Sequence, residues 1–270
     1  MFRVMFVPRK LSTWLDRVLP RALSIRLHRL YTPYHNWLVG RHSRRLIHQL
    51  FPEGDLFVRG GPFRGMKYLP LSSGSALVPK LLGVYEQELH DAFSRLLQRD
   101  YRTVIDIGCA EGYYLVGLAL QLPQAALLGF DLNPRALAAC RRLAEANGVA
   151  GRIRLQGRCC VESLAPVVGP RTLIVCDCEG AEVELLDPIR AQGLRQADLV
   201  VELHDWLVPG ASSLIQERFG PTHFVQVISS AERDPQVLSQ WAALSGEDRR
   251  LALDEFRPGP MEWMVMEARS

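Results

Sequence analysis

The sequence contains no apolar run that approaches the roughly 20 residues needed to cross a bilayer. Its first residues lack the uninterrupted apolar core and the small-residue cleavage site that are typical of a secretory signal. The chain also has no internal repeat and no low-complexity tract. These absences predict a cytoplasmic protein rather than a membrane-spanning or secreted one.

The six cysteines include no C-x-x-C pair, the spacing that is typical of structural zinc sites. Most of them lie in or beside apolar segments that predict strands. We therefore expect buried free thiols, a reducing compartment and no zinc.

Acidic residues are scarce in residues 1–50, where ten Lys and Arg accompany Asp16 alone. The rest of the chain holds 22 basic and 28 acidic residues, so the basic excess belongs to this N-terminal region. Residues 11–30 predict a basic amphipathic helix, interrupted by Pro20, and residues 41–50 predict a second short helix. The first helix either contacts the inner face of a membrane or an anionic partner, or packs as a cap with a solvated basic face.

Strand and helix signals alternate from Thr103 onward, which predicts a parallel sheet with helices on both faces. With 48% hydrophobic residues, the chain can bury such a core. We expect an α/β protein with a Rossmann-like, doubly wound seven-stranded sheet and an N-terminal helical extension. The predicted strands are 103–107, 126–131, 152–156, 171–176, 197–202, 222–229 and 261–268.

Three regions divide the chain in this interpretation. Residues 1–50 form the basic helical extension, residues 51–100 a hairpin with helices, and residues 101–270 the sheet domain. The hairpin is expected over 55–69, around Gly60-Gly61-Pro62, because two apolar runs flank these turn residues. Within the sheet domain, a polar helical insertion is expected over 231–257.

A nucleoside site is predicted by the stretch from Val104 to Tyr114, read together with Asp131. An apolar run ends in Asp106-Ile107, a small-residue turn of pattern G-x-A-x-G follows, and a second apolar run ends in Asp131. Glycines allow a close backbone approach, and a carboxylate at the next strand tip can accept hydrogen bonds from a ribose diol. Glu111 is expected to repel a pyrophosphate, whereas Asp106 can face a cation. S-adenosylmethionine (SAM) therefore fits this site better than NAD.

A second group of polar residues follows the fourth and fifth predicted strands, at the same edge of the sheet. It comprises Asp177, Glu179, Glu202, His204 and Asp205. His204 has the titration range of a general base at neutral pH, and Asp177 can orient a methyl acceptor or act as the base.

Other interpretations of this second group stay open. Carboxylates could hold Mg²⁺, although we expect no metal. Glu179 and Glu182 could simply favour a helix N-terminus. Cys178 could act as a nucleophile, but no further residue pattern supports that chemistry.

These motifs resemble the class I SAM-dependent methyltransferases and, among them, the FkbM-like family. The resemblance covers Tyr85 to Asp205. It is carried by Tyr85-Glu86-Gln87-Glu88-Leu89, Asp106-Ile107-Gly108-Cys109-Ala110-Glu111-Gly112, Phe130-Asp131-Leu132-Asn133-Pro134 and Asp177-Cys178-Glu179-Gly180-Ala181-Glu182.

The resemblance implies SAM as methyl donor and a hydroxyl as acceptor. It also implies cofactor-binding positions at Asp106, Gly108, Ala110, Gly112 and Asp131. The family often has Asn at the position of Glu111 and Glu at that of Asp131, so the details of the glycine loop differ here.

We therefore expect O-methylation of a small molecule or glycan. The fourth strand lacks the Asn/Asp-Pro-Pro-aromatic pattern that binds an exocyclic amine, which argues against nucleobase N-methylation. Two alternatives stay open: a nucleic-acid methyltransferase that uses the basic N-terminal arm, and a non-catalytic SAM-binding or membrane-associated protein. The sequence leaves the oligomeric state open.

Overall fold

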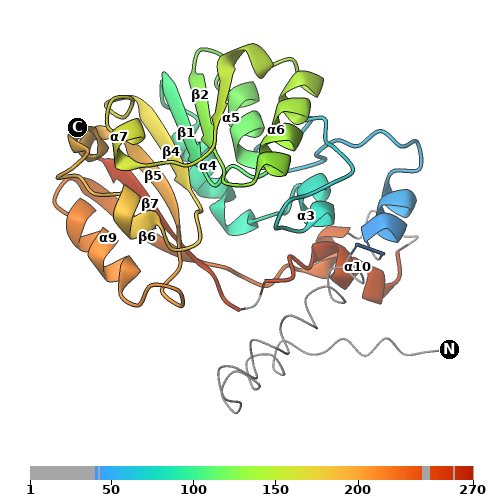
Figure 1. The fold of residues 1–270 in the computed structure, drawn as a ribbon. Coiled ribbons are helices and arrows are strands. Elements are labelled where there is room, and N and C mark those ends of the chain that lie inside the picture. Colours follow the sequence, from blue (N-terminus) through green and yellow to red (C-terminus); the bar gives the residue numbers. More distant parts are fainter. Residues whose placement is uncertain (1–39, 42, 239–243, 258, 270) are drawn as a thin grey trace, which may run out of the picture.

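The computed structural model describes residues 40–41, 43–238, 244–257 and 259–269, so the predicted helix over 11–30 lies outside them. One seven-stranded sheet of order β3-β2-β1-β4-β5-β7-β6 forms the centre of this part (Figure 1). The strands are β1 (Thr103–Ile107), β2 (Ala126–Phe130), β3 (Ile153–Gln156), β4 (Thr172–Cys176), β5 (Asp198–Leu203), β6 (His223–Ser229) and β7 (Glu262–Ala268).

The direction and order of the strands decide where a ligand can bind. Strands β1 to β5 are mutually parallel, and β7 runs antiparallel to both of its neighbours, β5 and β6. The order reverses beside β1, which has β2 on one side and β4 on the other. Such a reversal opens a crevice at the carboxyl ends of the strands. This arrangement is the Rossmann-like fold of class I methyltransferases, and it confirms the predicted fold class.

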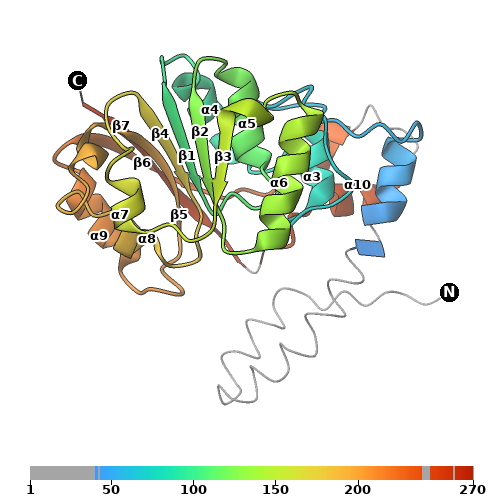
Figure 2. The same cartoon turned by 45° about the horizontal axis from the view of Figure 1, so that its top comes forward.

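The described residues contain eight α-helices, together with helical residues 40–41 and 43–50. The eight are α3 (Leu77–Leu82), α4 (His90–Leu96), α5 (Tyr113–Gln121), α6 (Pro134–Ala146), α7 (Val161–Leu164), α8 (Glu182–Leu185), α9 (Ala211–Phe219) and α10 (Gly246–Leu253). Most of them flank the sheet, whereas α3, α10 and residues 43–50 lie to one side of it (Figure 2). Asn133 caps α6 by accepting a hydrogen bond from the Arg135 N–H at 3.0 Å, as its place before Pro134 predicts.

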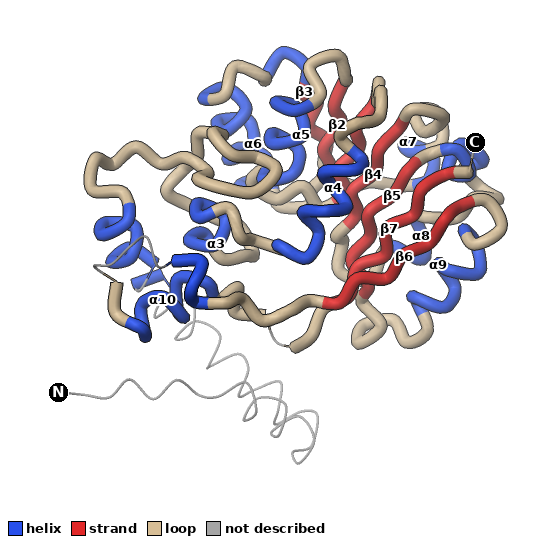
Figure 3. The backbone as a smooth tube through the Cα atoms, turned by 180° about the vertical axis from the view of Figure 1, so that it is seen from behind, coloured by secondary structure: helices blue, strands red, loops and turns tan. Residues whose placement is uncertain are grey.

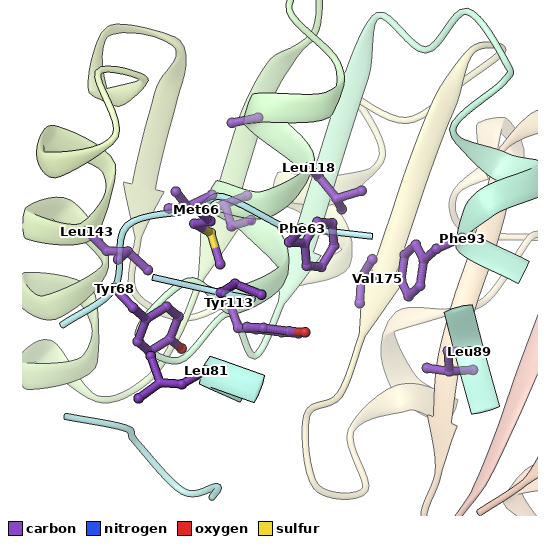
Figure 4. Close-up of a cluster of buried hydrophobic side chains, with 14 of the residues drawn as sticks. Phe63, Met66, Tyr68, Leu81, Leu89, Phe93, Tyr113, Leu118, Leu143 and Val175 are labelled. Carbon is purple, nitrogen blue, oxygen red and sulfur yellow. The ribbon is translucent and has the colours of Figure 1, made fainter. Parts of the chain in front are cut away.

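Two buried cores lie on opposite faces of the sheet, because successive strand residues point to opposite sides. Val104 and Val175 face the core that contains α4, α5 and α6. Ile105 and Ile174 face the core that contains α7, α8 and α9. Figure 4 shows part of the first core, where aromatic side chains from residues 63–113 pack together.

The hairpin predicted over residues 55–69 is confirmed only in a short form. Its two arms are joined by one isolated antiparallel bridge, Phe57 to Lys67, and by backbone hydrogen bonds from the Val58 N–H to Met66 and from the Tyr68 N–H to Leu56, both at 2.8 Å. Phe63 is instead buried in the first core, in edge-to-face contact with Phe93 and Tyr113. Its ring lies so close to Gly117 of α5 that a Cβ there would be 2.5 Å from it. Packing of this aromatic ring therefore shapes the turn between the arms, and strand pairing is limited to a few residues on either side of it.

The insertion predicted over 231–257 contains α10, which packs beside α3 (Figure 3). Residues 51–83 share the first core with α5, so this part of the chain is continuous with the sheet domain in its packing. The predicted boundaries at residues 50 and 100 stay a prediction. Among the described helices, none is both long enough and apolar enough to cross a membrane.

Candidate functional site

A cavity of about 590 Å³ opens at the carboxyl ends of β1, β2, β4 and β5, a volume within the range of small-molecule sites. Six of the seven predicted site residues line it: Asp106, Gly108, Ala110, Asp131, Asp177 and His204. The seventh, Gly112, lies outside the lining. It precedes α5 with φ 99°, and a Cβ at this position would lie 2.7 Å from the sulfur of Cys140. Gly112 therefore permits the turn into α5 without lining the cavity itself.

Gly108 is required by the path of the backbone after β1. Its φ is 86°, and an added Cβ would lie only 1.7 Å from the carbonyl oxygen of Asp177. No other residue type fits a position where two loops approach so closely. The missing side chain at Gly108 thus brings the loops after β1 and β4 together around one cavity.

Asp131 holds the tip of this loop. Its Oδ2 accepts a hydrogen bond from the Ala110 N–H at 2.8 Å, and its Oδ1 accepts one from the Asn133 N–H at 2.7 Å. A carboxylate offers about four lone-pair positions, so each oxygen can accept one further hydrogen bond from a ligand hydroxyl.

Asp106 is a buried acid whose charge is only partly compensated, by the Lys80 ammonium and the Leu115 N–H. Its Oδ2 has no hydrogen-bond partner among the described residues. Burial, together with the nearby Asp131 carboxylate, raises the pKa of Asp106 to about 8. A cationic ligand group in the cavity would stabilise the ionised form. Asp106 and Asp131 therefore fit the ammonium and ribose ends of SAM.

Glu111 does not face the cavity, so the predicted repulsion of a pyrophosphate by this residue is wrong. Its carboxylate is fully buried and accepts hydrogen bonds from Lys80 Nζ at 2.6 Å and Tyr68 Oη at 2.7 Å. The Ser72 hydroxyl and the Ser73 N–H complete the set, both at 2.9 Å. Burial alone would raise the pKa of Glu111, but the Lys80 ammonium and these donors lower it to about 2. Glu111 joins the glycine loop to residues 68–80.

His204 is the centre of the second group of residues. Its side chain is 2% exposed, and Nδ1 lies 2.9 Å from Oε1 of Glu182. On the cavity side, Nε2 lies 3.6 Å from both Asp177 Oδ1 and Glu179 Oε2, and 4.0 Å from Glu202 Oε2. Burial disfavours the imidazolium, but Glu182 and the other carboxylates outweigh burial and raise the pKa of His204.

Asp177 and Glu202 lie together beside His204. Burial is the main reason why the pKa of Asp177 rises to about 7 and that of Glu202 to about 8. Arg257 donates to Glu202 at 2.7 Å, to Glu255 at 2.7 Å and also to Glu86. Its charge is therefore shared among three carboxylates that come from distant parts of the sequence.

Asp205, which we expected in the same group, points elsewhere. It accepts hydrogen bonds from the Gly210 N–H at 3.2 Å and from the Ser212 hydroxyl at 3.0 Å, at the start of α9. Asp205 is thus a capping residue.

The sulfur of Cys178 lies 3.6 Å from that of Cys176, and both thiols are free, as predicted.

Sequence reasoning missed the roles of Glu182, Lys80 and Arg257. Glu182 was interpreted as a charge at a helix N-terminus, yet it contacts the presumed base directly. The spacing D-x-E-G-x-E was the only available signal for Glu182. Nothing in the sequence links Lys80 to Glu111 or Arg257 to Glu202.

A metal ion is geometrically conceivable at one place in the described ranges. One atom each of Asp177, Glu179 and His204 lie within 4.8 Å of one another. Glu179 is 73% exposed, and exposed acidic groups commonly lie together without a metal, so we do not identify these residues as metal ligands. The expected absence of a metal stays a prediction.

Comparison with known proteins gives a family match for the segment that contains the glycine loop and Asp131. A family model described as a methyltransferase domain matches residues 99–158, which contain β1, the glycine loop and β2. The ribosomal protein L11 methyltransferase of Edwardsiella ictaluri is 46% identical over 54 residues, and that of Aeromonas salmonicida is 46% identical over 55 residues. Each alignment covers 20% of this chain and 18% of the relative, so the chain spans about a fifth of these relatives.

Two solved structures illustrate the wider similarity. The precorrin-8w decarboxylase of Methanobacterium thermoautotrophicum has 14% identity and a TM-score of 0.49, over 74% of this chain and 96% of that one. The O-methyltransferase TomG of Streptomyces achromogenes, solved with SAM, has 14% identity and a TM-score of 0.45, over 69% and 82%. Within the described residues, the sheet topology, the cavity and the family match over residues 99–158 agree on a methyltransferase domain, a class of domain for which SAM is the methyl donor.

Proposed function

We propose that this protein is an O-methyltransferase of the FkbM-like group that methylates a hydroxyl of a small molecule or glycan. The observation that carries the proposal is His204, a buried imidazole whose Nε2 faces the cavity beside Asp177. Hydroxyls are weak nucleophiles, and their methylation is assisted by a base within reach of the proton.

Four residues that line the cavity have a role in this proposal. SAM, when bound, supplies a methyl group activated by a sulfonium. Asp106 binds the ammonium of the donor, and Asp131 accepts hydrogen bonds from its ribose. His204 Nε2 takes the proton of the acceptor hydroxyl, while Asp177 orients that hydroxyl.

The charge around His204 favours a neutral acceptor over a phosphorylated one. Asp177, Glu179 and Glu202 surround its Nε2, and the guanidinium of Arg257 already donates to three carboxylates. A phosphate group beside His204 would meet three carboxyl groups and an arginine that is already paired, which argues against RNA or DNA as acceptor.

The rim of the cavity offers a surface for a ring. Trp206 lines the cavity and is 63% exposed, and its ring centroid lies 6.3 Å from that of His204. An exposed indole can pack against the apolar face of a sugar or another ring. The proposed membrane contact through residues 11–30 and the cytoplasmic location stay predictions.

Incubation of the purified full chain with methyl-labelled SAM and fractionated cell extract tests the proposal. We expect label in a small-molecule or glycan fraction, as a base-stable methyl ether, and much less label with His204→Gln. Calorimetry should show unchanged SAM affinity for this variant. Label that appears only in nucleic acid or protein, or full activity of His204→Gln, would contradict the proposal.

A further inference from the structure

Glu182 is a buried carboxylate that contacts His204 but takes no part in the proposed methyl transfer as described so far. It is 1% exposed and lies at the start of α8, a helix of only four residues. Its Oε1 accepts a hydrogen bond from the Cys178 N–H at 3.1 Å and lies 2.9 Å from Nδ1 of His204. The backbone after β4 therefore fixes this carboxylate, and the carboxylate in turn contacts the imidazole.

We propose that Glu182 is a positioning residue, which holds His204 in the tautomer that carries its proton on Nδ1 and leaves the lone pair of Nε2 facing the acceptor. This inference rests on the proposed O-methylation, but it adds a residue and a protonation state to that proposal.

The argument begins with the two ring nitrogens. In a neutral imidazole one nitrogen is a donor and the other an acceptor, and the hydrogen bond at one nitrogen decides which is which. An ionised carboxylate can only accept, so the contact at 2.9 Å requires the proton on Nδ1. Burial alone would raise the pKa of Glu182, but the hydrogen bond with His204 helps to lower it, which keeps the carboxylate ionised.

The step at the acceptor then balances. The O–H bond of the acceptor breaks, its proton moves to Nε2, and its electron pair stays on oxygen for the bond to the methyl carbon. The imidazolium that results keeps Nδ1–H on Glu182 and places Nε2–H beside Asp177 and Glu179. Glu179 is 73% exposed, so it can accept this proton and release it to solvent.

Other groups also face His204, and the inference takes them into account. Asp177, Glu179 and Glu202 stabilise an imidazolium from the Nε2 side, and Trp206 packs near the ring. None of these carboxylates approaches Nε2 closer than 3.6 Å, whereas Glu182 is within hydrogen-bond distance of Nδ1. Glu182 therefore decides the tautomer.

A simple structural role for Glu182 predicts something different. A charge near the start of α8 would act equally well from Glu184, which is exposed on the same short helix. The matched pair Glu182→Gln and Glu184→Gln separates the two roles. Each removes one charge from α8 without changing the size of the side chain. Only Gln at 182 replaces the ionised acceptor at Nδ1 by an amide, which can either accept or donate and therefore no longer fixes the tautomer.

The first test reads the tautomer directly and does not need a methyl acceptor. Long-range ¹H–¹⁵N spectra of the full chain, with His204 assigned by His204→Gln, should show a bare Nε2 and a protonated Nδ1 above the titration range. Glu182→Gln should weaken this preference for Nδ1–H and lower the pKa of His204, while Glu184→Gln should leave both unchanged. A wild-type His204 with its proton on Nε2 would overturn the inference, even if the enzyme methylates hydroxyls.

The second test uses the acceptor found by labelling. Glu182→Gln should lower kcat by roughly 10²-fold, the lower end of what a positioned base contributes, with SAM affinity unchanged. The acidic limb of its pH–kcat profile should move to lower pH. Wild-type kcat with an unmoved profile would refute the positioning role. Absence of any methylated hydroxyl, together with the expected tautomer, would refute only the proposed function.

Discussion

Replacement of Lys80 by Met tests the buried pair that joins the glycine loop to residues 68–80. Lys80 and Glu111 are 3% and 0% exposed, and their Nζ and Oε1 atoms are 2.6 Å apart. Removal of one partner from a buried pair leaves an unpaired charge and typically costs about 3–5 kcal/mol. Glu111 would keep three hydrogen bonds, from Tyr68, Ser72 and Ser73, so we expect the lower end of this range, about 3 kcal/mol. For a chain of this size, that loss lowers Tm by roughly 6–12 °C.

Urea unfolding of the full chain, followed by circular dichroism, measures this loss. Lys67→Met is the matched control, because Lys67 is exposed, and it should change the free energy of unfolding by less than about 0.5 kcal/mol. The double variant Lys80→Met with Glu111→Gln should lose less than the sum of the single variants, since neither leaves the other charged and unpaired. A Lys80→Met protein as stable as the control would show that the pair contributes nothing, and the account of the glycine loop given above would fail.

Three further predictions concern the cofactor side of the cavity. Gly108→Ala should destabilise the fold by more than about 3 kcal/mol in a thermal or urea melt, because its Cβ would meet a carbonyl oxygen. The control Gly148→Ala, with φ 70° and free space around the added Cβ, should cost only about 1–2 kcal/mol. Equal losses in the two variants would disprove the steric reason. Asp131→Ala should weaken SAM binding at least about 10-fold by calorimetry, since the variant loses both the ribose acceptor and the hydrogen bonds that hold the loop. Unchanged affinity would show that Asp131 does not bind the cofactor. The pKa of Asp106 is raised to about 8, so this acid is mostly neutral at pH 7. Binding of the SAM ammonium should therefore release a proton, which is detected as a dependence of the binding enthalpy on the buffer. The absence of that dependence in the wild-type protein would argue against the contact.

The pH dependence of stability follows from the same residues. Folding lowers the pKa of Glu111 from 4.5 to about 2, so the stability from this carboxylate is fully present above pH 4.5. It should be lost as the pH falls from about 4.5 to about 2, because the unfolded chain then binds a proton that the folded chain does not. Urea unfolding at a series of acidic pH values should show this slope in wild type and a smaller one in Lys80→Met. An identical slope in both proteins would contradict the assignment to Glu111.

All seven strands were predicted to within about one residue at each end, because buried parallel strands form short apolar runs between clear turn signals. Asn133, Pro134 and Gly148 determine α6 locally, so its prediction needed no tertiary information. The hairpin is shorter than predicted because Phe63 is stabilised by packing against α5, a contact that lies far away in the sequence.

The side chains of the site were harder to predict than its backbone. Position at the end of a strand placed Asp106, Asp177 and His204 correctly at the cavity, since parallel strands bring their carboxyl ends together. The direction of a side chain in a loop depends on partners that the local sequence does not contain. Glu111 therefore pointed to Lys80 instead of the ligand, and Asp205 capped α9 instead of joining the cavity.

The Arg257 network explains why an insertion far from the glycine loop belongs to the site. Arg257 follows α10, and its guanidinium donates to Glu202 at the end of β5 and to Glu86 before α4. Burial raises the pKa of Glu86 to about 7 and that of Glu202 to about 8, although Arg257 opposes both shifts. Arg257 thus offsets only part of the cost of burying these acids, and a positive charge that binds beside them would favour their ionised forms. Such a site stabilises positive charge, which suits both a sulfonium donor and an imidazole that must accept a proton.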